Sequence, residues 1–325
     1  MAKEDLEDNV KDLISVIMST YYEPLTWIEQ AVDSILNQTY RDIEFIIVID
    51  APDNMELVRY AMKKKEQDNR IIVHINEKNM GLTASLNTAI KLANGEYIAR
   101  MDADDTAEFD RLSCQMEYLI SHNLDLIGCN VKDIDENGKI LNPIGTHYPT
   151  SDKVIKKFLK TNSAIIHPTW LTRKSVYIEM GMYHDFPACE DYEFLTRIAL
   201  AGYRLGNLKE AKQMYRINTK GISNTKKIMQ KSSHYFVKHN YNAKRQSNLD
   251  EFYQFIESDA GKKKQKSLRN YYEDSAKLKE YYRARKWGMF LTAGIKTFIK
   301  SAEGRTVVIS IFREKLLQLR YGKCY

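Results

Sequence analysis

Residues 97–105 read Tyr-Ile-Ala-Arg-Met-Asp-Ala-Asp-Asp, an apolar segment that runs directly into three carboxylates. The apolar part predicts a buried strand, and the end of a strand holds side chains rigidly. Because Asp102 and Asp104 are two residues apart, a local turn must bring them together. Carboxylates this close repel one another unless a cation lies between them, and Mg²⁺ and Mn²⁺ prefer oxygen ligands. Two interpretations are open: a metal-assisted site for a diphosphate group, or an acidic solvated turn with Asp105 as a helix cap.

Three further apolar segments precede this strand, and segments with helical spacing of apolar residues separate them. Strands are expected at residues 13–19, 43–49, 71–75 and 97–101. Helices are expected at residues 25–36, 55–65 and 82–92. This alternation predicts right-handed crossovers and an α/β fold with a mostly parallel sheet. Ligands of such sheets bind outside the carboxyl ends of the strands, where the four loops at residues 20–23, 50–53, 79–81 and 102–105 would face one crevice.

Glycine-rich phosphate-binding motifs are missing from the sequence. No Gly-x-Gly-x-x-Gly follows the first strand, and no Gly-x-x-x-x-Gly-Lys-Ser/Thr occurs. A dinucleotide-binding fold and a P-loop ATPase are therefore both disfavoured. If a nucleotide binds, carboxylates, a metal and aromatic contacts must hold it.

Four segments occur in a characteristic order through roughly residues 12–220. They are residues 15–23 (Ser-Val-Ile-Met-Ser-Thr-Tyr-Tyr-Glu), 33–40 (Asp-Ser-Ile-Leu-Asn-Gln-Thr-Tyr), 79–87 (Asn-Met-Gly-Leu-Thr-Ala-Ser-Leu-Asn) and 95–105 (Gly-Glu-Tyr-Ile-Ala-Arg-Met-Asp-Ala-Asp-Asp). Each is weak alone, but the ordered set resembles the inverting glycosyltransferases of family 2. The resemblance implies the Rossmann-like GT-A fold, with helices flanking the sheet.

The resemblance also implies a nucleotide-sugar donor, most often a UDP-sugar, and a divalent Mn²⁺ or Mg²⁺. Tyr21 is expected to stack near the base, Asp50 to accept a hydrogen bond from the base edge, and Asp102 to lie near the ribose. Asp104 is expected to ligate the metal on the diphosphate. The full expected donor set is Ser19, Thr20, Tyr21, Glu23, Asp50, Gly81, Arg100 and Asp102. Without the resemblance, Tyr21 could simply pack on the sheet edge and Asp50 could be a turn residue.

Residues 189–194, Cys-Glu-Asp-Tyr-Glu-Phe, open a helix that is expected to run to about residue 202. Acidic side chains at the start of a helix interact favourably with the helix dipole, so these residues could instead stabilise the end of the helix. The resemblance implies that Asp191 is the catalytic base. Chemically this fits, because inversion needs one carboxylate to take the acceptor proton, while the metal offsets charge on the leaving diphosphate. Glu190 could orient a loop or bind acceptor hydroxyls.

Two further residues are candidates for the sugar or acceptor pocket. His167 and Trp170 occupy positions where family members shape that pocket, and His167 could equally be a structural histidine. One departure concerns the segment after Tyr215-Arg216, where many relatives carry a histidine and this chain has Asn218. The metal shell would then be incomplete or completed by water, and Arg216 and Lys220 would carry more of the diphosphate charge.

Charge is unevenly distributed along the 325 residues. From residue 226 onward there are 23 Lys and Arg against 9 Asp and Glu, a net charge of +14, whereas residues 1–225 carry −8. We expect a catalytic domain over residues 1–225 and a basic, aromatic-rich helical extension over residues 226–325. The extension could lie on an anionic membrane surface or pack against the body or a second subunit in a homo-oligomer. No nucleic-acid-binding module accompanies its basic residues.

Neither a secretory leader nor a membrane span is expected. Residues 1–8 are polar, and no apolar run reaches the roughly 20 residues that a spanning helix needs. The four cysteines contain no Cys-x-x-Cys pair, so neither a zinc site nor a disulfide framework is expected. The expected location is the cytoplasm, with possible contact at the inner face of the cell membrane.

The leading hypothesis is a transferase that moves one sugar to a hydroxyl of a growing glycan, lipid-linked or protein-attached. A sugar-nucleotide pyrophosphorylase would need a glycine-rich basic loop after the first strand, which is missing. A non-catalytic, nucleotide-sugar-binding or scaffold subunit of a glycan assembly complex is the alternative from another class. The presence of Asp102, Asp104 and Asp191 argues against it.

Overall fold

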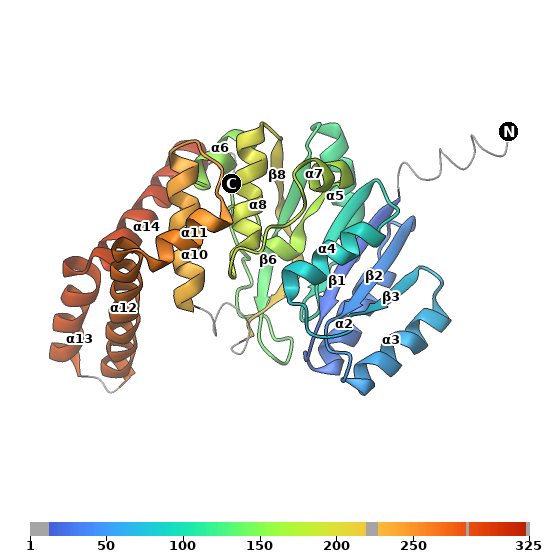
Figure 1. Ribbon diagram of the computed structural model, residues 1–325, viewed down its shortest axis with the longest axis horizontal. Helices are drawn as coiled ribbons and strands as arrows, with labels where there is room; N and C mark the ends of the chain where they lie inside the picture. Colours follow the sequence, from blue (N-terminus) through green and yellow to red (C-terminus); the bar gives the residue numbers. More distant parts are fainter. Residues whose placement is uncertain (1–12, 219–226, 284–285, 323–325) are drawn as a thin grey trace.

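The computed structural model describes residues 13–218, 227–283 and 286–322. Expectations about residues 1–8, Lys220 and Cys324 lie outside these ranges. The described residues form one mixed sheet with helices on both faces and a helical extension at one side (Figure 1). The strands are β1 (Ile14–Thr20), β2 (Ile43–Ile49), β3 (Ile71–Ile75), β4 (Tyr97–Asp102), β5 (Thr106–Ala107), β6 (Leu126–Ile134), β7 (Leu171–Arg173) and β8 (Leu205–Arg216). Their order in the sheet is β3-β2-β1-β4-β7-β6-β8-β5.

The first half of the sheet is parallel, as predicted. β1 pairs in parallel with β2 and β4, and β2 pairs in parallel with β3. The connecting helices α2 (Leu25–Leu36), α3 (Met55–Gln67) and α4 (Leu82–Leu92) agree with the predicted ranges to within two residues. The carboxyl ends of β1, β2 and β4 therefore meet at one edge of the sheet.

Alternate residues of the strands enter two hydrophobic clusters, one on each face of the sheet. Val16 of β1 packs with Ile28 and Val32 of α2, whereas its neighbour Ile17 packs with Leu86 of α4. Every residue of β2 is buried. This explains why these strands are continuous apolar runs, since both faces of a parallel sheet are covered by helices.

The second half of the sheet contains the antiparallel strand β7, which lies between β4 and β6. The hairpin signal at Glu136-Asn137-Gly138 predicts strands at residues 125–134 and 139–141, and β6 matches the first of them. The strand predicted at residues 139–141 is reduced to a single bridge between Ile134 and Ile140, beyond a turn in which Gly138 has a φ of 83°. The strands β7 and β8 had no counterpart in the prediction.

The remaining helices of the body are α5 (Arg111–Ser121), α6 (Asp152–Phe158), the 3₁₀ turn η1 (His167–Thr169), α7 (Lys174–Glu179) and α8 (Glu190–Ala201). The extension contains α10 (Lys227–Asn242), α11 (Leu249–Glu257), α12 (Asp259–Arg283), α13 (Trp287–Gly294), the π-helical segment η2 (Ile295–Lys300) and α14 (Ala302–Tyr321). Among the described residues, no helix combines the length and the apolar character that crossing a bilayer requires.

The extension begins as part of the body. Phe236 and Val237 of α10 and Phe252 of α11 belong to the same hydrophobic cluster as Phe194 of α8. Further along, α12 and α13 project away from the sheet (Figure 1). The division between residues 225 and 226 therefore stays a prediction, because the first helices after it share a core with the sheet.

A buried carboxylate joins three strands at the opposite, amino-terminal end of the sheet. Glu44 of β2 accepts hydrogen bonds from Ser15 Oγ (2.5 Å), from Asn94 N (2.5 Å) and from Asn94 Nδ2 (2.9 Å). Gly95 N donates to Ser15 Oγ at 2.9 Å, just before β4 begins. A Cβ atom on Gly95 would lie 2.4 Å from the carbonyl oxygen of Leu13, so the contact requires glycine.

We expect Gly95→Ala to lower the free energy of unfolding by about 1–3 kcal/mol, because backbone atoms that cannot move aside meet the new methyl group. Urea unfolding followed by circular dichroism measures it. Gly288→Ala is the matched control, because nothing lies within 4 Å of a Cβ at this helical position. The control should be neutral or stabilising by up to about 1 kcal/mol. Equal stability of the two variants would contradict this description of the strand junction.

Candidate active site

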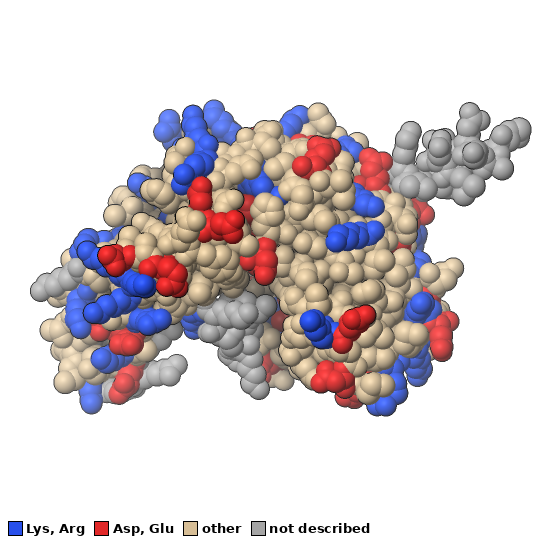
Figure 2. Space-filling view, viewed as in Figure 1, with Lys and Arg blue, Asp and Glu red and all other residues tan. Residues whose placement is uncertain are grey.

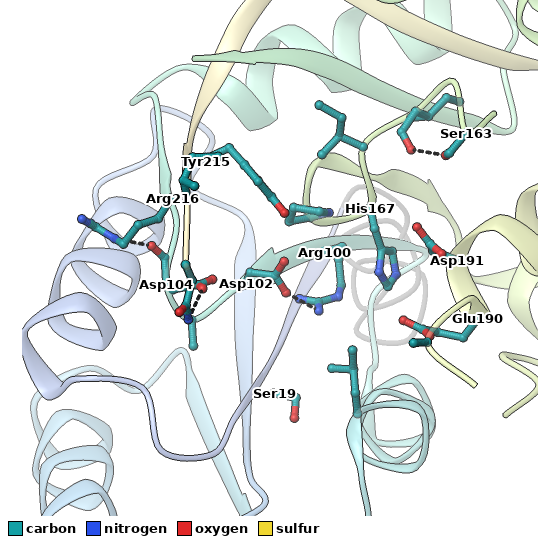
Figure 3. Close-up of a pocket in the computed structure, with 18 of the residues that line it drawn as sticks. Ser19, Arg100, Asp102, Asp104, Ser163, His167, Glu190, Asp191, Tyr215 and Arg216 are labelled. Carbon is teal, nitrogen blue, oxygen red and sulfur yellow. Dashed lines mark hydrogen bonds and ion pairs between the residues drawn. The ribbon is translucent and has the colours of Figure 1, made fainter. Parts of the chain in front are cut away.

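A cavity of about 550 Å³ opens at the carboxyl ends of β1 and β4. Residues from both halves of the sheet line it, together with Gln230 of α10. The charged and polar lining residues are Ser19, Glu23, Arg100, Asp102, Asp104, Tyr148, Ser163, His167, Glu190, Asp191, Tyr215, Arg216, Asn218 and Gln230. Figure 3 shows Asp104 on one side of the cavity and Glu190 and Asp191 on the other, with Asp102 and Arg100 between them.

The three carboxylates after β4 converge. Oxygen atoms of Asp102, Asp104 and Asp105 all lie within 4.8 Å of one another. Asp105 is fully buried, and its two oxygens accept hydrogen bonds from Gln213 Nε2 and from the backbone N–H of Arg216, both at 2.8 Å. It is not a helix cap, since α5 begins only at Arg111. Asp105 therefore fastens β8 to the cluster, and Asp102 and Asp104 remain on the cavity wall.

The electrostatics of this cluster favour a cation. Burial raises the pKa of Asp104 to about 7, and the negative charges of Asp102 and Glu23 add to the shift. One oxygen of Asp102 forms an ion pair with Arg100, a buried residue of β4. Among the described residues, the side chain that donates to Asp104 is Asn218, whose Nδ2 lies 3.4 Å from Oδ2 of Asp104. This donor set of hard oxygen atoms, with an excess of negative charge, fits Mg²⁺ or Mn²⁺.

A second pair of carboxylates lies in the first turn of α8. Glu190 is buried, and burial together with the charge of Asp191 raises the pKa of Glu190 to about 8. The pKa of Asp191 is also raised, chiefly by burial. The preceding Ala188 has a φ of 52°, an unusual value for a residue with a side chain, and this bend directs the start of the helix into the cavity.

The third acid of this helix does not take part in the cavity wall. Glu193 is fully buried and forms an ion pair with Arg197 at 2.9 Å. Arg197 Nη2 also donates to the carbonyl oxygen of Met182 at 2.8 Å. Glu193 and Arg197 thus hold the loop before α8 in place.

His167 lies on the cavity wall, whereas Trp170 lies behind it. His167 Nε2 is 2.8 Å from the hydroxyl of Tyr183, which is in turn 2.8 Å from the hydroxyl of Tyr177. Burial, with a smaller effect of Arg100, lowers the pKa of His167 well below its usual value, so the ring is neutral at pH 7. Trp170 is fully buried, with its ring 4.6 Å from that of His167.

The predicted nucleotide-binding loops lie next to the cavity. Glu23 accepts hydrogen bonds from Thr20 Oγ1 (2.8 Å) and from the backbone N–H of Tyr21 (2.7 Å), which fixes the loop after β1. Asp50 accepts from Met80 N (2.7 Å) and from Gly81 N (2.9 Å), so it holds the loop before α4. Ser19 and Glu23 line the cavity, but the described lining residues do not include Thr20, Tyr21, Asp50, Gly81 or Trp170.

The guanidinium of Arg216 donates hydrogen bonds to other groups of the protein. It donates to the carbonyl oxygens of Asp104, Asp135 and Glu136 and to the side chain of Gln30. Arg216 therefore positions the loop of Asp104, which argues against the expectation that it carries diphosphate charge.

Several lining residues were not among the predicted site residues. Tyr148 and Ser163 follow irregular segments, and Tyr215 lies on β8, whose sequence of alternating charges and small residues is not typical of a buried strand. Gln230 comes from beyond the predicted domain boundary. Only the folded sheet brings these residues to the cavity.

Comparison of the sequence with known proteins identifies the family of this chain. The family model described as glycosyl transferase family 2 matches residues 15–181. An uncharacterized glycosyltransferase of Methanocaldococcus jannaschii is 35% identical over 208 residues, covering 64% of this chain and 71% of the relative. The O-antigen biosynthesis glycosyltransferase WbnJ of Escherichia coli is 34% identical over 214 residues, covering 65% and 82%.

Solved structures show the same fold. A structure of residues 1–349 of S. aureus TarS superposes with a TM-score of 0.53 at 19% identity, covering 86% of this chain and 89% of that one. The predicted GT-A-like sheet with flanking and C-terminal helices is thereby confirmed. With this fold, the family match and the relatives together, the chain belongs to glycosyl transferase family 2 and is a sugar-transferring enzyme.

Proposed function

We propose that the protein transfers a single sugar, with inversion, from a nucleotide-sugar to a hydroxyl of a growing glycan. The donor class is a nucleoside diphosphate sugar, with UDP as the leading nucleotide. One observation carries the proposal: two separate groups of carboxylates face each other across one cavity, Asp102 with Asp104 and Glu190 with Asp191. Two such groups are suited to the two charge changes of the reaction, on the leaving diphosphate and on the attacking hydroxyl.

The first group fits a divalent metal. Asp104 and the oxygen of Asp102 that faces away from Arg100 would hold Mn²⁺ or Mg²⁺, with water in the remaining positions. Asn218, which stands where many relatives carry a histidine, donates to Asp104 at the same cluster. When bound, such an ion offsets negative charge on a diphosphate leaving group. The ion pair with Arg100 orients Asp102.

The second group supplies the base. The carboxylate of Asp191 would take the proton of the acceptor hydroxyl as its oxygen bonds to the anomeric carbon and the bond to the diphosphate breaks. Glu190, with a pKa of about 8, is protonated at pH 7 and can donate a hydrogen bond to an acceptor hydroxyl. A neutral Glu190 also leaves Asp191 as the only charge of the pair. Neutral His167 on the same wall would contact the sugar.

The relatives support a glycan as the product. One of them is named for O-antigen biosynthesis, and a relative from Erwinia amylovora, 30% identical over 200 residues, is named for amylovoran biosynthesis. We propose an acceptor of this kind, a growing glycan on a lipid or protein carrier, and a cytoplasmic location in which nucleotide-sugars are available.

Asp191→Asn should bind the donor with unchanged affinity but transfer sugar between about 100- and 10,000-fold more slowly, because a carboxamide cannot accept the proton. Donor binding is measured by calorimetry and transfer by release of the nucleoside diphosphate in the presence of acceptor. Asp185→Asn, an exposed acid of the neighbouring loop, is the matched control and should retain full activity. Transfer at the normal rate by Asp191→Asn would exclude this residue as the base.

Above pH 8 we expect kcat/KM for the donor to fall, because Glu190 loses its proton there and adds a second charge beside Asp191. Its pKa is raised, so the neutral form prevails below pH 8 and the charged form above it. Glu190→Gln imitates the neutral form and should keep kcat/KM constant through this range. A decline that persists unchanged in Glu190→Gln would assign it to another group.

A further inference from the structure

The outer face of α14 exposes a continuous set of large apolar side chains. Phe312 and Leu319 are 68% and 79% exposed, and a contiguous apolar patch of this kind often marks an interaction site. The exposed apolar members are Val308, Ile309, Ile311, Phe312, Leu316 and Leu319. One side of the helix carries Ile309 and the residues three, seven and ten positions after it, which are Phe312, Leu316 and Leu319.

The exposed charged residues of α14 are all positive. Arg305, Arg313, Lys315 and Arg320 are exposed along α14. The two acidic residues of α14 lie away from the apolar face. Glu303 is buried and forms an ion pair with Lys264 at 2.7 Å. Glu314 accepts a hydrogen bond from Ser310 and lies about half a turn around the helix from Phe312. Figure 2 shows Lys and Arg over much of the helical extension, with Asp and Glu interspersed.

The segment before α14, which contains α13 and η2, also combines exposed apolar side chains with lysines. Met289, Leu291, Ile295 and Ile299 of α13 and η2 are between 47% and 63% exposed. Lys286 and Lys296 are exposed in the same segment. In Figure 1, α13 lies at the far end of the extension, whereas α14 runs back toward the body, where Leu317 and Tyr321 pack against the hydrophobic cluster of the sheet.

We propose that α14, together with α13 and η2, docks the enzyme on an anionic lipid bilayer surface. A helix that carries an apolar face bordered by Lys and Arg can bury the apolar side chains among the acyl chains while its cations contact lipid phosphates. No described helix could instead span the bilayer. A second copy of the chain fits this face less well, because pairing would place the basic borders of two copies against each other. Nucleic acid would pair with the cations but leave the aliphatic side chains uncovered.

The test is co-sedimentation of the full-length protein with vesicles of phosphatidylcholine, alone or mixed with phosphatidylglycerol. The protein should bind the mixed vesicles, bind the neutral ones much more weakly, and be released by salt. Replacing Arg313 and Lys315 with Gln should weaken binding by about fivefold for each charge removed. Phe312→Ser should weaken it by about tenfold or more.

Matched controls come from exposed residues elsewhere. Phe109→Ser, at a 64% exposed position, and the exposed pair Lys63→Gln with Lys65→Gln on α3 should bind as the unmodified protein does. All variants should keep circular dichroism spectra and donor affinity unchanged, since none touches the cavity. Loss of vesicle binding in α14 variants alone would support the proposal.

Two results would overturn it. The first is no binding of the intact protein to anionic vesicles, or binding that the α14 substitutions leave unchanged. The second is a dimer in lipid-free sedimentation velocity that Phe312→Ser dissociates, since the apolar face would then belong to a second copy. Neither outcome depends on the sugar-transfer reaction, so the docking proposal and the proposed function fail separately.

Discussion

The architecture of the site depends on the mutual repulsion of three carboxylates at the carboxyl end of β4. Asp102, Asp104 and Asp105 lie within 4.8 Å of one another in a partly buried setting, which is unfavourable unless each charge is compensated. The protein offsets part of this repulsion itself. Asp105 accepts hydrogen bonds from β8, and Asp102 pairs with buried Arg100. Burial and the neighbouring carboxylates still raise the pKa of Asp104 and of Asp105, so their charges stay unfavourable, and a divalent cation at the cluster would stabilise them.

Hydrogen bonds from two buried arginines connect the second half of the sheet to the carboxylate cluster at the end of the first half. Buried Arg111 donates to the carbonyl oxygens of Arg100 and Pro168 and to the side chain of Gln213, so it joins β4, the turn of His167 and β8. Arg216 joins the Asp104 turn to the loop at Asp135 and to α2. The same strand, β8, thus secures the Asp104 turn and supplies Tyr215 and Arg216 to the cavity wall. Asp191, the proposed base, lies on a different element, α8, so the proposed metal binding and proton transfer can be tested with separate substitutions.

The sequence predicted the parallel half of the fold well, because buried strands such as Ile43–Ile49 are continuous apolar runs bounded by turns. It predicted the cavity residues that end these strands, Asp102 and Asp104, for the same reason. It did not predict β8, whose charged residues Lys209, Glu210 and Lys212 break the apolar pattern, or the buried role of Arg216. Nor could periodicity show that Asp50 and Glu23 turn their oxygens toward backbone N–H groups, or that Trp170 lies behind His167. Such contacts are set by tertiary packing between segments far apart in the chain.

The most direct test of the central claim is calorimetric titration of the purified protein with a panel of UDP-, dTDP- and GDP-sugars, in Mn²⁺ and again in EDTA. The account predicts that one donor binds, and that removing the metal or substituting Asp104→Ala weakens binding by at least about tenfold, because the diphosphate charge then meets uncompensated carboxylates. Asp42→Ala, an exposed acid at the opposite end of the sheet, should leave affinity unchanged. Donor binding that is indifferent to both the metal and Asp104, or no binding across the panel, would contradict the account.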